Sequence, residues 1–418
     1  MNKTASKKKT AKALPITFSD IEAAAKAIKG RVVETPAEFS EVLSEATGSD
    51  IYLKFEIFQH TASFKERGAL NKLLSLNAEE KKRGVIAASA GNHAQAVAFH
   101  AKQLGIPATI VMPKDTPFTK VKRTEIHGAS IVLSGKTFSD AMNRCRQLEK
   151  EKGFIFIPTF DDPLIMAGHG TVAIEFLEKF PDLDILVVPI GGGGLVSGVA
   201  VAAKALKPDI KIYGVQSEVY PSMKEALAGR KIEPVQQTVA EGIAIKEPGV
   251  LTRQVVEALV DDILVVTEPL IERAINTFIE VEKVVVEGAG AAPLAAVMQY
   301  PGMFRKQKTG LIISGANIDP KILAYSLMRG LARDGRVSRL RVTTPDMPGS
   351  LADLTRIVAE NGGNIIEVYH QRQFADIALK YTSIELVVET KDAPHADNVV
   401  KALEAEGFEV ARISLAEG

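Results

Sequence analysis

Six short apolar runs alternate with amphipathic segments along the middle of this 418-residue chain, and this alternation restricts the fold more than any other feature. The runs lie at residues 84–88, 108–112, 130–133, 154–157, 185–190 and 311–313. Strands that are buried on both faces of a parallel sheet have this near-continuous apolar character. Helical periodicity is found between them, over residues 92–104, 119–127, 138–150 and 167–180. The pattern predicts an open α/β fold, whose ligand sites lie beyond the carboxyl ends of the strands.

The pattern changes after Gly335, where strands and helices follow one another in a different order. We expect a strand, a helix, two strands, a helix and a strand, over residues 337–344, 351–361, 364–371, 384–389, 396–406 and 408–415. This is the βαββαβ order of a ferredoxin-like unit. The chain is therefore expected to have a large domain over residues 15–330, a linker over 331–335 and a small domain over 336–418.

The first dozen residues carry five lysines and no apolar segment, which predicts a disordered, Lys-rich tail over residues 1–14. Ordered structure is expected to begin at Ser19. Ser19 and Glu22 have the spacing of a capping box, which would begin a helix over residues 21–29.

Composition argues against several classes of protein. The chain has 51 basic and 51 acidic side chains, so no net field attracts it to nucleic acid or to a membrane surface. No uncharged apolar run approaches the ~18 residues of a membrane-spanning helix. The single Cys145 cannot form an intrachain disulfide, and it fits a reducing compartment such as the cytoplasm.

Four consecutive glycines, Gly191, Gly192, Gly193 and Gly194, stand between a buried apolar run and a segment of small residues that is expected to be helical. Glycine backbone can turn tightly and present N–H groups to an anion, and the start of a helix favours negative charge. The spacing fits neither the dinucleotide fingerprint nor the P-loop. A phosphate site is favoured over a flexible linker, because the glycines lie between a buried strand and a helix.

Two further motifs carry polar groups. Lys65 stands in Ser63-Phe64-Lys65-Glu66-Arg67-Gly68 at the expected start of a helix, where most lysines are simply solvated. A lysine of lowered pKa can instead form an imine, and Phe64 would place an apolar face beside it. The hydroxyl, amide and helix N–H groups of Ser89-Ala90-Gly91-Asn92-His93 could hold a carboxylate. His93 has no partner at ligand spacing, so a structural or orienting role is favoured over a metal site.

Taken in order, six motifs resemble those of the fold-type II pyridoxal phosphate enzymes, which have the tryptophan synthase β-like fold. The motifs are Ser63–Gly68, Ser89–His93, Gly191–Leu195, Glu241–Ala244, Glu287–Gly290 and Ser314–Asn317. Over residues 15–330 the chain is most similar to the threonine dehydratase (threonine ammonia-lyase) branch. The remainder, with Pro345–Leu351 and Gly362–Ile365, resembles a single ACT domain, which is a regulatory module. The resemblance also implies a homotetramer or a homodimer.

Carried over by position, the resemblance implies that Lys65 holds pyridoxal 5'-phosphate as an imine and later moves the α-proton of the substrate. Phe64 would lie beside the cofactor, Asn92 would bind its phenolic oxygen, and Ser314 would face its ring nitrogen. The four glycines would hold the phosphate. The substrate carboxylate would be surrounded by Ser89, Ala90, Gly91, Asn92 and His93.

Three positions depart from the patterns of relatives. Related serine racemases have an acid/base serine where this chain has Ala90, so efficient racemisation is not expected. Relatives with a structural divalent cation often have an acidic residue at the position of Gln216, so no metal site is predicted. Glu241 stands where many relatives have aspartate.

The ACT domain is expected to bind an amino-acid effector, such as isoleucine or valine, at an interface between two copies. The residues expected to bind it are Asp346, Gly349, Leu351, Asn364 and Ile365. The alternative is a domain that only dimerises, because a fold alone never determines a function.

The activity implied by the resemblance is loss of water and ammonia from L-threonine to give 2-oxobutanoate, with L-serine as a secondary substrate. A serine or hydroxyaspartate dehydratase is the alternative within the family, and a non-catalytic amino-acid sensor is the alternative of another class. The presence of Lys65, Asn92, Ser314 and the glycine run argues against the sensor. Whether the activity serves isoleucine biosynthesis or threonine breakdown stays open.

Overall fold

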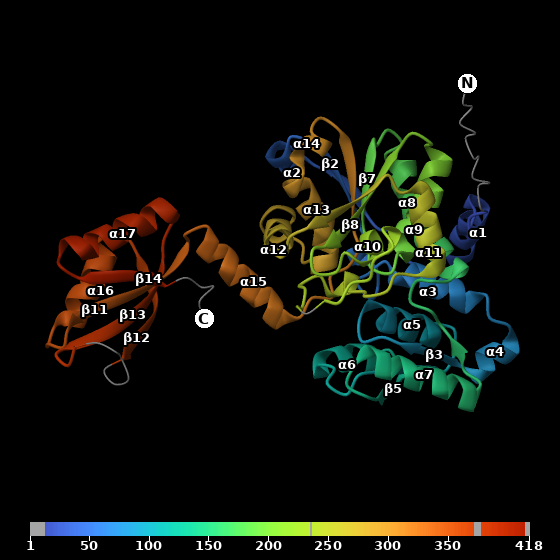
Figure 1. Ribbon diagram of the computed structural model, residues 1–418, viewed down its shortest axis with the longest axis horizontal. Helices are drawn as coiled ribbons and strands as arrows, with labels where there is room; N and C mark the ends of the chain where they lie inside the picture. Colours follow the sequence, from blue (N-terminus) through green and yellow to red (C-terminus); the bar gives the residue numbers. More distant parts are fainter. Residues whose placement is uncertain (1–12, 235, 372–377, 414–418) are drawn as a thin grey trace, which may run out of the picture. The chain divides into compact units, whose positions relative to one another are not determined.

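The computed structural model describes residues 13–234, 236–371 and 378–413, so most of the tail predicted over residues 1–14 lies outside the described residues. The chain forms two compact units that divide between Ile318 and Asp319 (Figure 1). The first unit contains two largely parallel sheets, and the second contains one antiparallel sheet. Among the described residues, no helix is long and apolar enough to cross a membrane.

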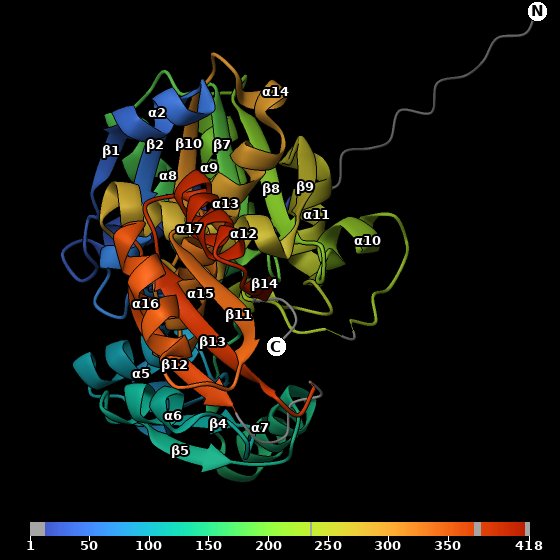
Figure 2. The ribbon, with the colours of Figure 1, turned by 90° about the vertical axis from the view of Figure 1, so that its left-hand side faces the viewer.

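A six-stranded sheet forms the centre of the first unit. Its order is β1-β2-β10-β7-β8-β9, and every neighbouring pair is parallel except β1 with β2 (Figure 2). The strands are β1 (Ala37–Ser40), β2 (Asp50–Phe55), β7 (Ile185–Pro189), β8 (Lys211–Ser217), β9 (Asp262–Val266) and β10 (Lys308–Ile313). Strand β7 is buried along its whole length, because helices cover both faces of the sheet.

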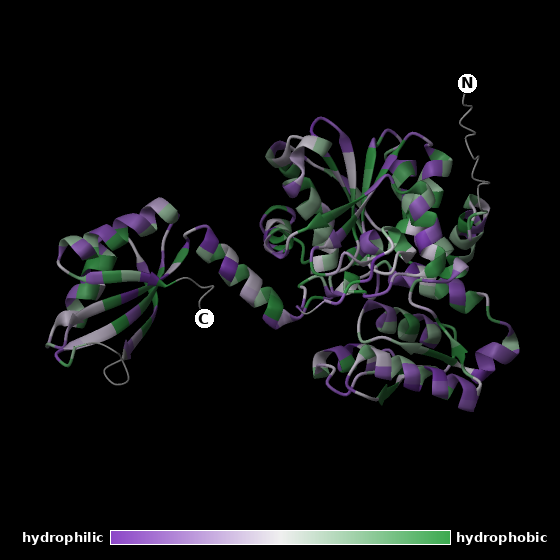
Figure 3. Ribbon diagram, in the orientation of Figure 1, coloured by the Kyte–Doolittle hydropathy of each residue, from purple (hydrophilic) through white to green (hydrophobic). Residues whose placement is uncertain are grey.

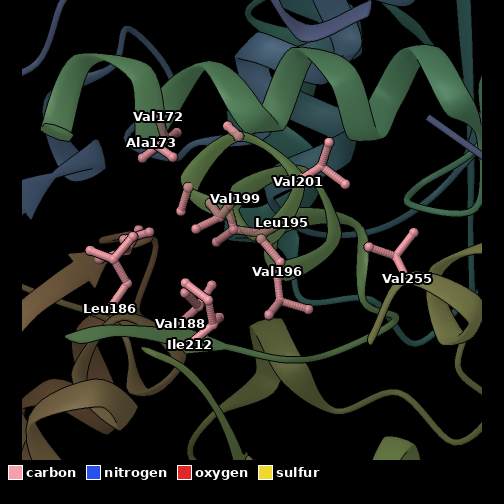
Figure 4. Close-up of a cluster of buried hydrophobic side chains, with 14 of the residues drawn as sticks. Val172, Ala173, Leu186, Val188, Leu195, Val196, Val199, Val201, Ile212 and Val255 are labelled. Atoms are coloured by element: carbon pink, nitrogen blue, oxygen red, sulfur yellow. The ribbon is translucent and has the colours of Figure 1, made fainter. Parts of the chain in front are cut away.

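Four helices cover one face of this sheet and two cover the other (Figure 1). The first group is α1 (Phe18–Ile28), α8 (Pro163–Lys179), α9 (Gly194–Leu206) and α11 (Val250–Leu259), and the second is α12 (Glu268–Thr277) and α13 (Gly288–Gln299). Figure 4 shows the apolar cluster beneath the first group, including Leu186 and Val188 of β7 and Val196 and Val199 of α9. The shorter elements are α2 (Glu41–Thr47), η1 (Glu56–Phe58), α10 (Ser222–Leu227), η2 (Glu241–Ile243), η3 (Phe278–Glu282) and α14 (Pro301–Phe304).

A second, four-stranded parallel sheet has the order β5-β4-β3-β6. Its strands are β3 (Val85–Ala88), β4 (Ala108–Met112), β5 (Ser130–Leu133) and β6 (Ile155–Phe156). The helices around it are α3 (Lys65–Leu74), α4 (Ala78–Arg83), α5 (Asn92–Gln103), α6 (Phe118–Glu125) and α7 (Phe138–Lys152). Cys145 is buried on α7 as a packing residue. The six predicted strands are thus confirmed, and they divide between two sheets of an α/β fold.

Glycines let helices α3, α8 and α9 approach one another closely. A Cβ on Gly68 of α3 would lie 2.5 Å from Nε2 of His169 on α8. A Cβ on Gly198 of α9 would lie 2.2 Å from the carbonyl oxygen of Met166 on α8. Distances this short leave no room for a methyl group, so the backbones of the three helices lie close together. The start of α3 is therefore fixed relative to the start of α9.

A buried network of charges holds the first turn of α3. The guanidinium of Arg67 is fully buried and donates to both carboxylate oxygens of Glu56, at 2.8 Å each. It also donates to both oxygens of Glu175, at 2.5 and 2.7 Å. The buried Lys54 donates to Glu175 as well, at 2.5 Å. Two cations thus balance two anions, which is the arrangement that an interior tolerates.

The second unit has a four-stranded antiparallel sheet in the order β12-β13-β11-β14. Its strands are β11 (Val337–Pro345), β12 (Asn364–Gln371), β13 (Tyr381–Glu389) and β14 (Glu409–Ile413), and its helices are α16 (Ser350–Glu360) and α17 (Ala393–Ala405). The core of this unit is formed by buried apolar residues of β11, β13, α16 and α17, and Figure 3 colours the hydrophobic parts of the ribbon green. The predicted βαββαβ order is confirmed. Residues 331–333 of the expected linker form the last turn of helix α15 (Pro320–Arg333).

The predicted start of the first helix is wrong. Helix α1 begins at Phe18, and its capping box is formed by Thr17 and Asp20 in place of Ser19 and Glu22. Both pairs have the same spacing, so the motif alone does not choose between them. The buried Ile16 and Ile21 occupy the two positions of a hydrophobic staple only when Thr17 is the N-cap, and this selects the earlier start.

Replacement of Arg67 by alanine is expected to destabilise the first unit by about 3–5 kcal/mol, because it leaves the buried carboxylate of Glu56 without its cation, whereas Glu175 keeps Lys54. The midpoint of urea unfolding measures the change. Arg144→Ala, which removes an exposed ion pair with Glu151, is the matched control and should change the midpoint little.

The difference in urea midpoint between the wild type and Arg67→Ala should become smaller as the pH is lowered. Burial alone would raise the pKa of Glu56, but the guanidinium of Arg67 holds this pKa below its ordinary value. Such a carboxylate contributes its full stabilisation above its unfolded-state pKa and loses it as the pH falls through the folded-state pKa. A difference between wild type and Arg67→Ala that stayed constant in acid would contradict this account.

Candidate active site

Lys65, the residue that the sequence singles out, is the first residue of helix α3. Its Nζ donates to the carbonyl oxygen of Thr159 at 3.1 Å and lies 5.0 Å from the centre of the Phe64 ring. Loss of hydration lowers the pKa of Lys65 to about 8, against the opposing effect of the nearby Glu287 carboxyl. More of this amine is uncharged at neutral pH than of an ordinary lysine, and the uncharged form is the nucleophile.

The segment before Lys65 is held against the end of strand β10. Ser63 and Gly315 form an antiparallel bridge, and the N–H of Phe64 donates to the carbonyl oxygen of Ser314 at 3.1 Å. Ser314 is 2 % exposed. The structure therefore brings Phe64, Lys65 and Ser314 together, although about 250 residues of sequence separate the two segments.

The same segment carries strain and unpaired hydroxyls. Ala62 has φ +55°, in the left-handed region that alanine rarely adopts, and its carbonyl oxygen accepts from the N–H of Ala316 at 3.0 Å. The hydroxyls of Thr61 and Ser63 are buried without a hydrogen-bond partner among the described residues. Strained backbone and unpaired buried polar groups gather at functional sites.

The second polar motif lies between strand β3 and helix α5. The hydroxyl of Ser89 accepts a hydrogen bond from the N–H of Gly91 at 3.2 Å, and Ala90 and Asn92 are half-buried beside this turn. A Cβ on Gly91 would meet no atom within 4 Å, so open space adjoins the turn. The motif thus forms a polar turn beside open space, as a carboxylate site requires.

His93 is oriented by the backbone of the neighbouring strand. Its Nε2 lies 3.1 Å from the carbonyl oxygen of Ile157, and because a carbonyl only accepts, Nε2 carries the hydrogen. Burial and the nearby charge of Lys65 lower the pKa of His93 to about 3, so the ring is neutral. The ring is therefore uncharged and held in one orientation, which suits an orienting role.

Asn92 connects residues from three parts of the chain. Its Nδ2 donates to Oε1 of Glu287 at 2.8 Å, and its Oδ1 accepts from Nδ2 of Asn317 at 2.8 Å. Nδ2 of Asn317 also donates to the carbonyl oxygen of Thr61 at 2.8 Å. The ends of strands β3 and β10 and the start of helix α13 therefore meet at this amide.

The four glycines form the turn between β7 and α9, as predicted. Gly193 is the N-cap of α9 and has φ +99°, which a residue with a side chain rarely adopts. A Cβ on Gly192 would lie 2.4 Å from the ring of Phe160, and one on Gly194 would lie 3.0 Å from Cβ of Phe160. A Cβ on Gly191 would lie 3.2 Å from Cα of Ile243. Without side chains, the turn presents its backbone and the start of α9 to an anion.

Residues 159–161, which sequence reasoning missed, connect Lys65 with the glycine turn and with the start of helix α11. Thr159 accepts from Lys65, Phe160 packs on the glycine turn, and the carboxylate of Asp161 accepts from three N–H groups at the start of α11. These residues follow strand β6. The rule that ligand sites lie beyond the carboxyl ends of parallel strands was therefore the signal that could have found them.

Gln216 occupies the position at which the resemblance placed an acidic metal ligand in relatives. Its Oε1 accepts from the N–H groups of Met223 and Lys224 at 3.1 Å each. Its Nε2 donates to the carbonyl oxygen of Ile190 at 3.2 Å and to Ser222 at 3.3 Å. All four hydrogen bonds are made to protein groups. No group of three or more potential metal-ligating side chains is found in the part of the chain that the structure describes.

Glu287 and Asn317 were matched in sequence only as parts of motifs, without a role of their own. Glu287 is a single carboxyl within an otherwise apolar stretch of valine, glycine and alanine, residues 285–292. A lone carboxyl in such a stretch indicates a specific partner, because burying an unpaired charge is costly. The structure makes Glu287 a direct neighbour of Asn92.

The expected effector residues divide between the two ends of the second unit. Asp346, Gly349 and Leu351 follow the end of β11, where Pro345 pairs with Tyr381. Asn364 and Ile365 begin β12, where Asn364 pairs with Glu389 at the other end of β13. Strand β13 has nine residues, so the two groups lie roughly 26 Å apart along it. A single copy of the unit does not bring them together.

The residues at the strand ends of the first unit fit pyridoxal phosphate. The cofactor needs an amine for its aldehyde, backbone N–H groups for its phosphate, and an aromatic or apolar face for its ring. Lys65, the glycine turn and Phe64 supply these groups, and Asn92 and Ser314 supply polar groups beside them. The lack of space for any Cβ at Gly192 and the φ of Gly193 are the structural features that carry this fit.

Comparison with known proteins agrees with this site. Residues 28–315 match the family described as pyridoxal-phosphate dependent enzyme, and residues 338–408 match the ACT domain. The L-threonine ammonia-lyase of Thermotoga maritima is 44% identical over 397 residues, which are 94% of this chain and 99% of that protein.

Two solved structures resemble the first unit. Threonine deaminase isoform 2 of Solanum lycopersicum, in its processed form, is 34% identical with a TM-score of 0.70, over 74% of this chain and 86% of that chain. Maize serine racemase is 35% identical with a TM-score of 0.71, over 76% of this chain and 99% of that chain. The chain therefore belongs to the family of pyridoxal-phosphate dependent enzymes of fold-type II, is a lyase related to the threonine ammonia-lyases, and carries a C-terminal ACT domain.

Proposed function

We propose that this protein removes water and then ammonia from L-threonine and releases 2-oxobutanoate, with L-serine as a secondary substrate. The observation that carries the proposal is the buried amine of Lys65, with its lowered pKa, beside the Phe64 ring and the glycine turn. The names of relatives that match along nearly the whole chain support threonine as the substrate. Serine has the same β-hydroxyl and lacks only the methyl group.

Lys65 is placed to hold the cofactor and then to accept the α-proton of the substrate at Nζ. A pKa of about 8 leaves part of the Lys65 population uncharged near neutral pH, so the same nitrogen can accept and return a proton. When bound, pyridoxal phosphate withdraws electrons from the α-carbon and makes its proton acidic. The N–H groups of the glycine turn hold the phosphate, and Phe64 excludes water from one side of Lys65.

The polar turn after β3 orients the substrate. Ser89, Gly91 and Asn92 supply hydroxyl, backbone and amide groups for its carboxylate, and the neutral ring of His93 stays fixed by Ile157. Ala90 has no group that exchanges a proton, so the chain lacks a second acid or base there for racemisation. The hydroxyl of Ser314 is neutral and does not stabilise a full positive charge on the ring nitrogen. This suits a reaction in which a β-hydroxyl leaves and removes the electrons.

An amino acid is proposed to regulate the activity through the ACT domain. The two expected halves of its site lie at opposite ends of one copy, so the site is complete only where two copies meet. Strand β12 is an edge strand, and its Ile366 and Val368 are exposed. An apolar edge of this kind favours pairing with a second chain. We therefore propose a homo-oligomer, with the cytoplasm as the compartment that suits one unpaired Cys145.

Replacement of Lys65 by alanine is expected to lower the rate of 2-oxobutanoate release from L-threonine by about 10²- to 10⁴-fold or more, because the acid/base amine is lost. Purified protein supplied with pyridoxal phosphate is assayed with L-threonine and with L-serine. Lys82→Ala, on the exposed face of α4, is the control and should keep its activity. A folded, cofactor-bound wild type that turned over neither substrate would remove threonine and serine as candidates.

An effector at the ACT domain is expected to change the apparent affinity for threonine by about 5- to 150-fold, which corresponds to a coupling of about 1–3 kcal/mol. Threonine saturation curves are recorded with each standard amino acid in turn. Asn364→Ala should remove the response and leave the basal rate, because Asn364 belongs to the second unit and its side chain donates to Glu389 of the same unit. The effector proposal is abandoned if no amino acid alters either the kinetics or the thermal stability.

A further inference from the structure

The side chain of Glu287 does not cap helix α13, although Glu287 stands at its N-cap position. It is the N-cap residue of α13, where a carboxylate ordinarily accepts from the first N–H groups of the helix, yet its side chain makes no such bond. The carboxyl is directed to Nδ2 of Asn92 at 2.8 Å instead. Glu287 is 8 % exposed, so this orientation carries the cost of a buried carboxyl without the benefit of a cap.

Two glycines leave room for this carboxyl. A Cβ on Gly315, at the end of β10, would lie 2.6 Å from Oε1 of Glu287. A Cβ on Gly242, in η2, would lie 2.8 Å from the same oxygen. Neither glycine has a positive φ, so the reason for the missing side chain is space and not backbone conformation. The structure thus encloses the Glu287 carboxyl from two sides.

A chain of hydrogen bonds that begins at Thr61 and ends at Glu287 determines how the amide of Asn92 is turned. The carbonyl oxygen of Thr61 only accepts, so the group of Asn317 that faces it is the NH₂. That NH₂ also faces Asn92, which must present its oxygen there. The NH₂ of Asn92 is then directed to Glu287 and uses one of its two hydrogens. The second hydrogen stays available for an oxygen of the cofactor.

The charges of Glu241 on η2 and of Lys120 on α6 also act on the carboxyl of Glu287. Burial raises the pKa of Glu287 to about 7, and Glu241 of η2 acts in the same direction. Hydrogen bonds from Asn92 and from the backbone of Asn317 lower the pKa of Glu287. The ammonium of Lys120 on α6, which pairs with Glu241, lowers it as well.

The carboxyl of Glu287 in turn affects the pKa of Lys65 on α3. The charge of Glu287 raises the pKa of Lys65 against the larger, opposite effect of burial. The carboxyl of Glu287 and the amine of Lys65 therefore have pKa values close to each other, about 7 and about 8. Loss of a proton from Glu287 adds a negative charge there and stabilises the charged form of the nitrogen at Lys65.

We propose that Glu287 is a positioning residue of this site: its enclosed carboxyl accepts from the amide of Asn92 and holds that amide in place, and its charge acts on Lys65. The inference rests on the proposed function only in that Lys65 holds the cofactor, and it does not depend on which amino acid is the substrate. No part of it requires Glu287 to touch the substrate.

The test follows the absorbance of the bound cofactor across the neutral pH range, without substrate, in full-length holoprotein. The wild type is expected to show an inflection near the pKa of Glu287, at about pH 7. Glu287→Gln keeps the size and the acceptor oxygen of the side chain but does not titrate, so this inflection should disappear. The kcat/KM of Glu287→Gln should fall by up to about 10²-fold, because the charge beside Lys65 is lost.

Glu241→Gln is the matched second variant, because the Glu241 side chain is 64% exposed and its replacement does not disturb the core. The charge of Glu241 raises the pKa of Glu287, so its loss lowers this pKa. The inflection should therefore remain and move to lower pH. This variant keeps the proposal testable if Glu287→Gln does not fold or does not bind the cofactor.

The outcomes separate the proposal from the proposed reaction. An unchanged inflection in Glu287→Gln, or one that stays at the wild-type pH in Glu241→Gln, overturns the role of Glu287. The expected shifts in a protein that does not act on threonine support the role of Glu287 and remove only the substrate. A purely structural role predicts lower stability in Glu287→Gln with the wild-type inflection retained.

Discussion

The position of Lys65 depends on the buried charge of Arg67, two residues further along the same helix. The guanidinium is bound by carboxylates from two different segments, Glu56 after strand β2 and Glu175 on helix α8. Helix α3 therefore cannot rotate or slide without separating buried charges, which is costly. The glycine contacts between α3, α8 and α9 add a steric limit to this electrostatic one. Together they hold the amine of Lys65 and the glycine turn in one fixed relation.

The sequence predicts most of the fold because its central strands are buried on both faces. Burial of this kind leaves a continuous apolar run, and the runs at 108–112 and 185–190 correspond to the largely buried strands β4 and β7. The half-exposed edge strand β1 leaves no such run, and β1, β2, β8 and β9 were not predicted. The start of α1 was misplaced because two capping boxes overlap, and only the packing of Ile16 against the core distinguishes them.

The individual motifs of the candidate site can be predicted from the sequence, but the contacts between them are harder to predict. Motifs locate Lys65, the glycine turn and Ser314, because their chemistry is visible in the residue types. The contact of residue 159 with Lys65 joins segments 94 residues apart, and that of Asn92 with Glu287 joins segments 195 residues apart. The pKa of Glu287 likewise depends on what the fold places around it, and no local pattern contains that information. The two halves of the effector site are predicted individually, but their separation follows only from the register of β13.

Gln216 holds the start of helix α10 against Ile190, the last residue before the glycine turn, with a neutral amide. An amide side chain is both a donor and an acceptor, so one residue satisfies two N–H groups and a carbonyl oxygen at once. This cross-link is made by hydrogen bonds to protein groups, and the charge of the amide does not vary with pH. At this contact, the position of the glycine turn relative to helix α10 therefore depends on neutral hydrogen bonds that titration leaves unchanged.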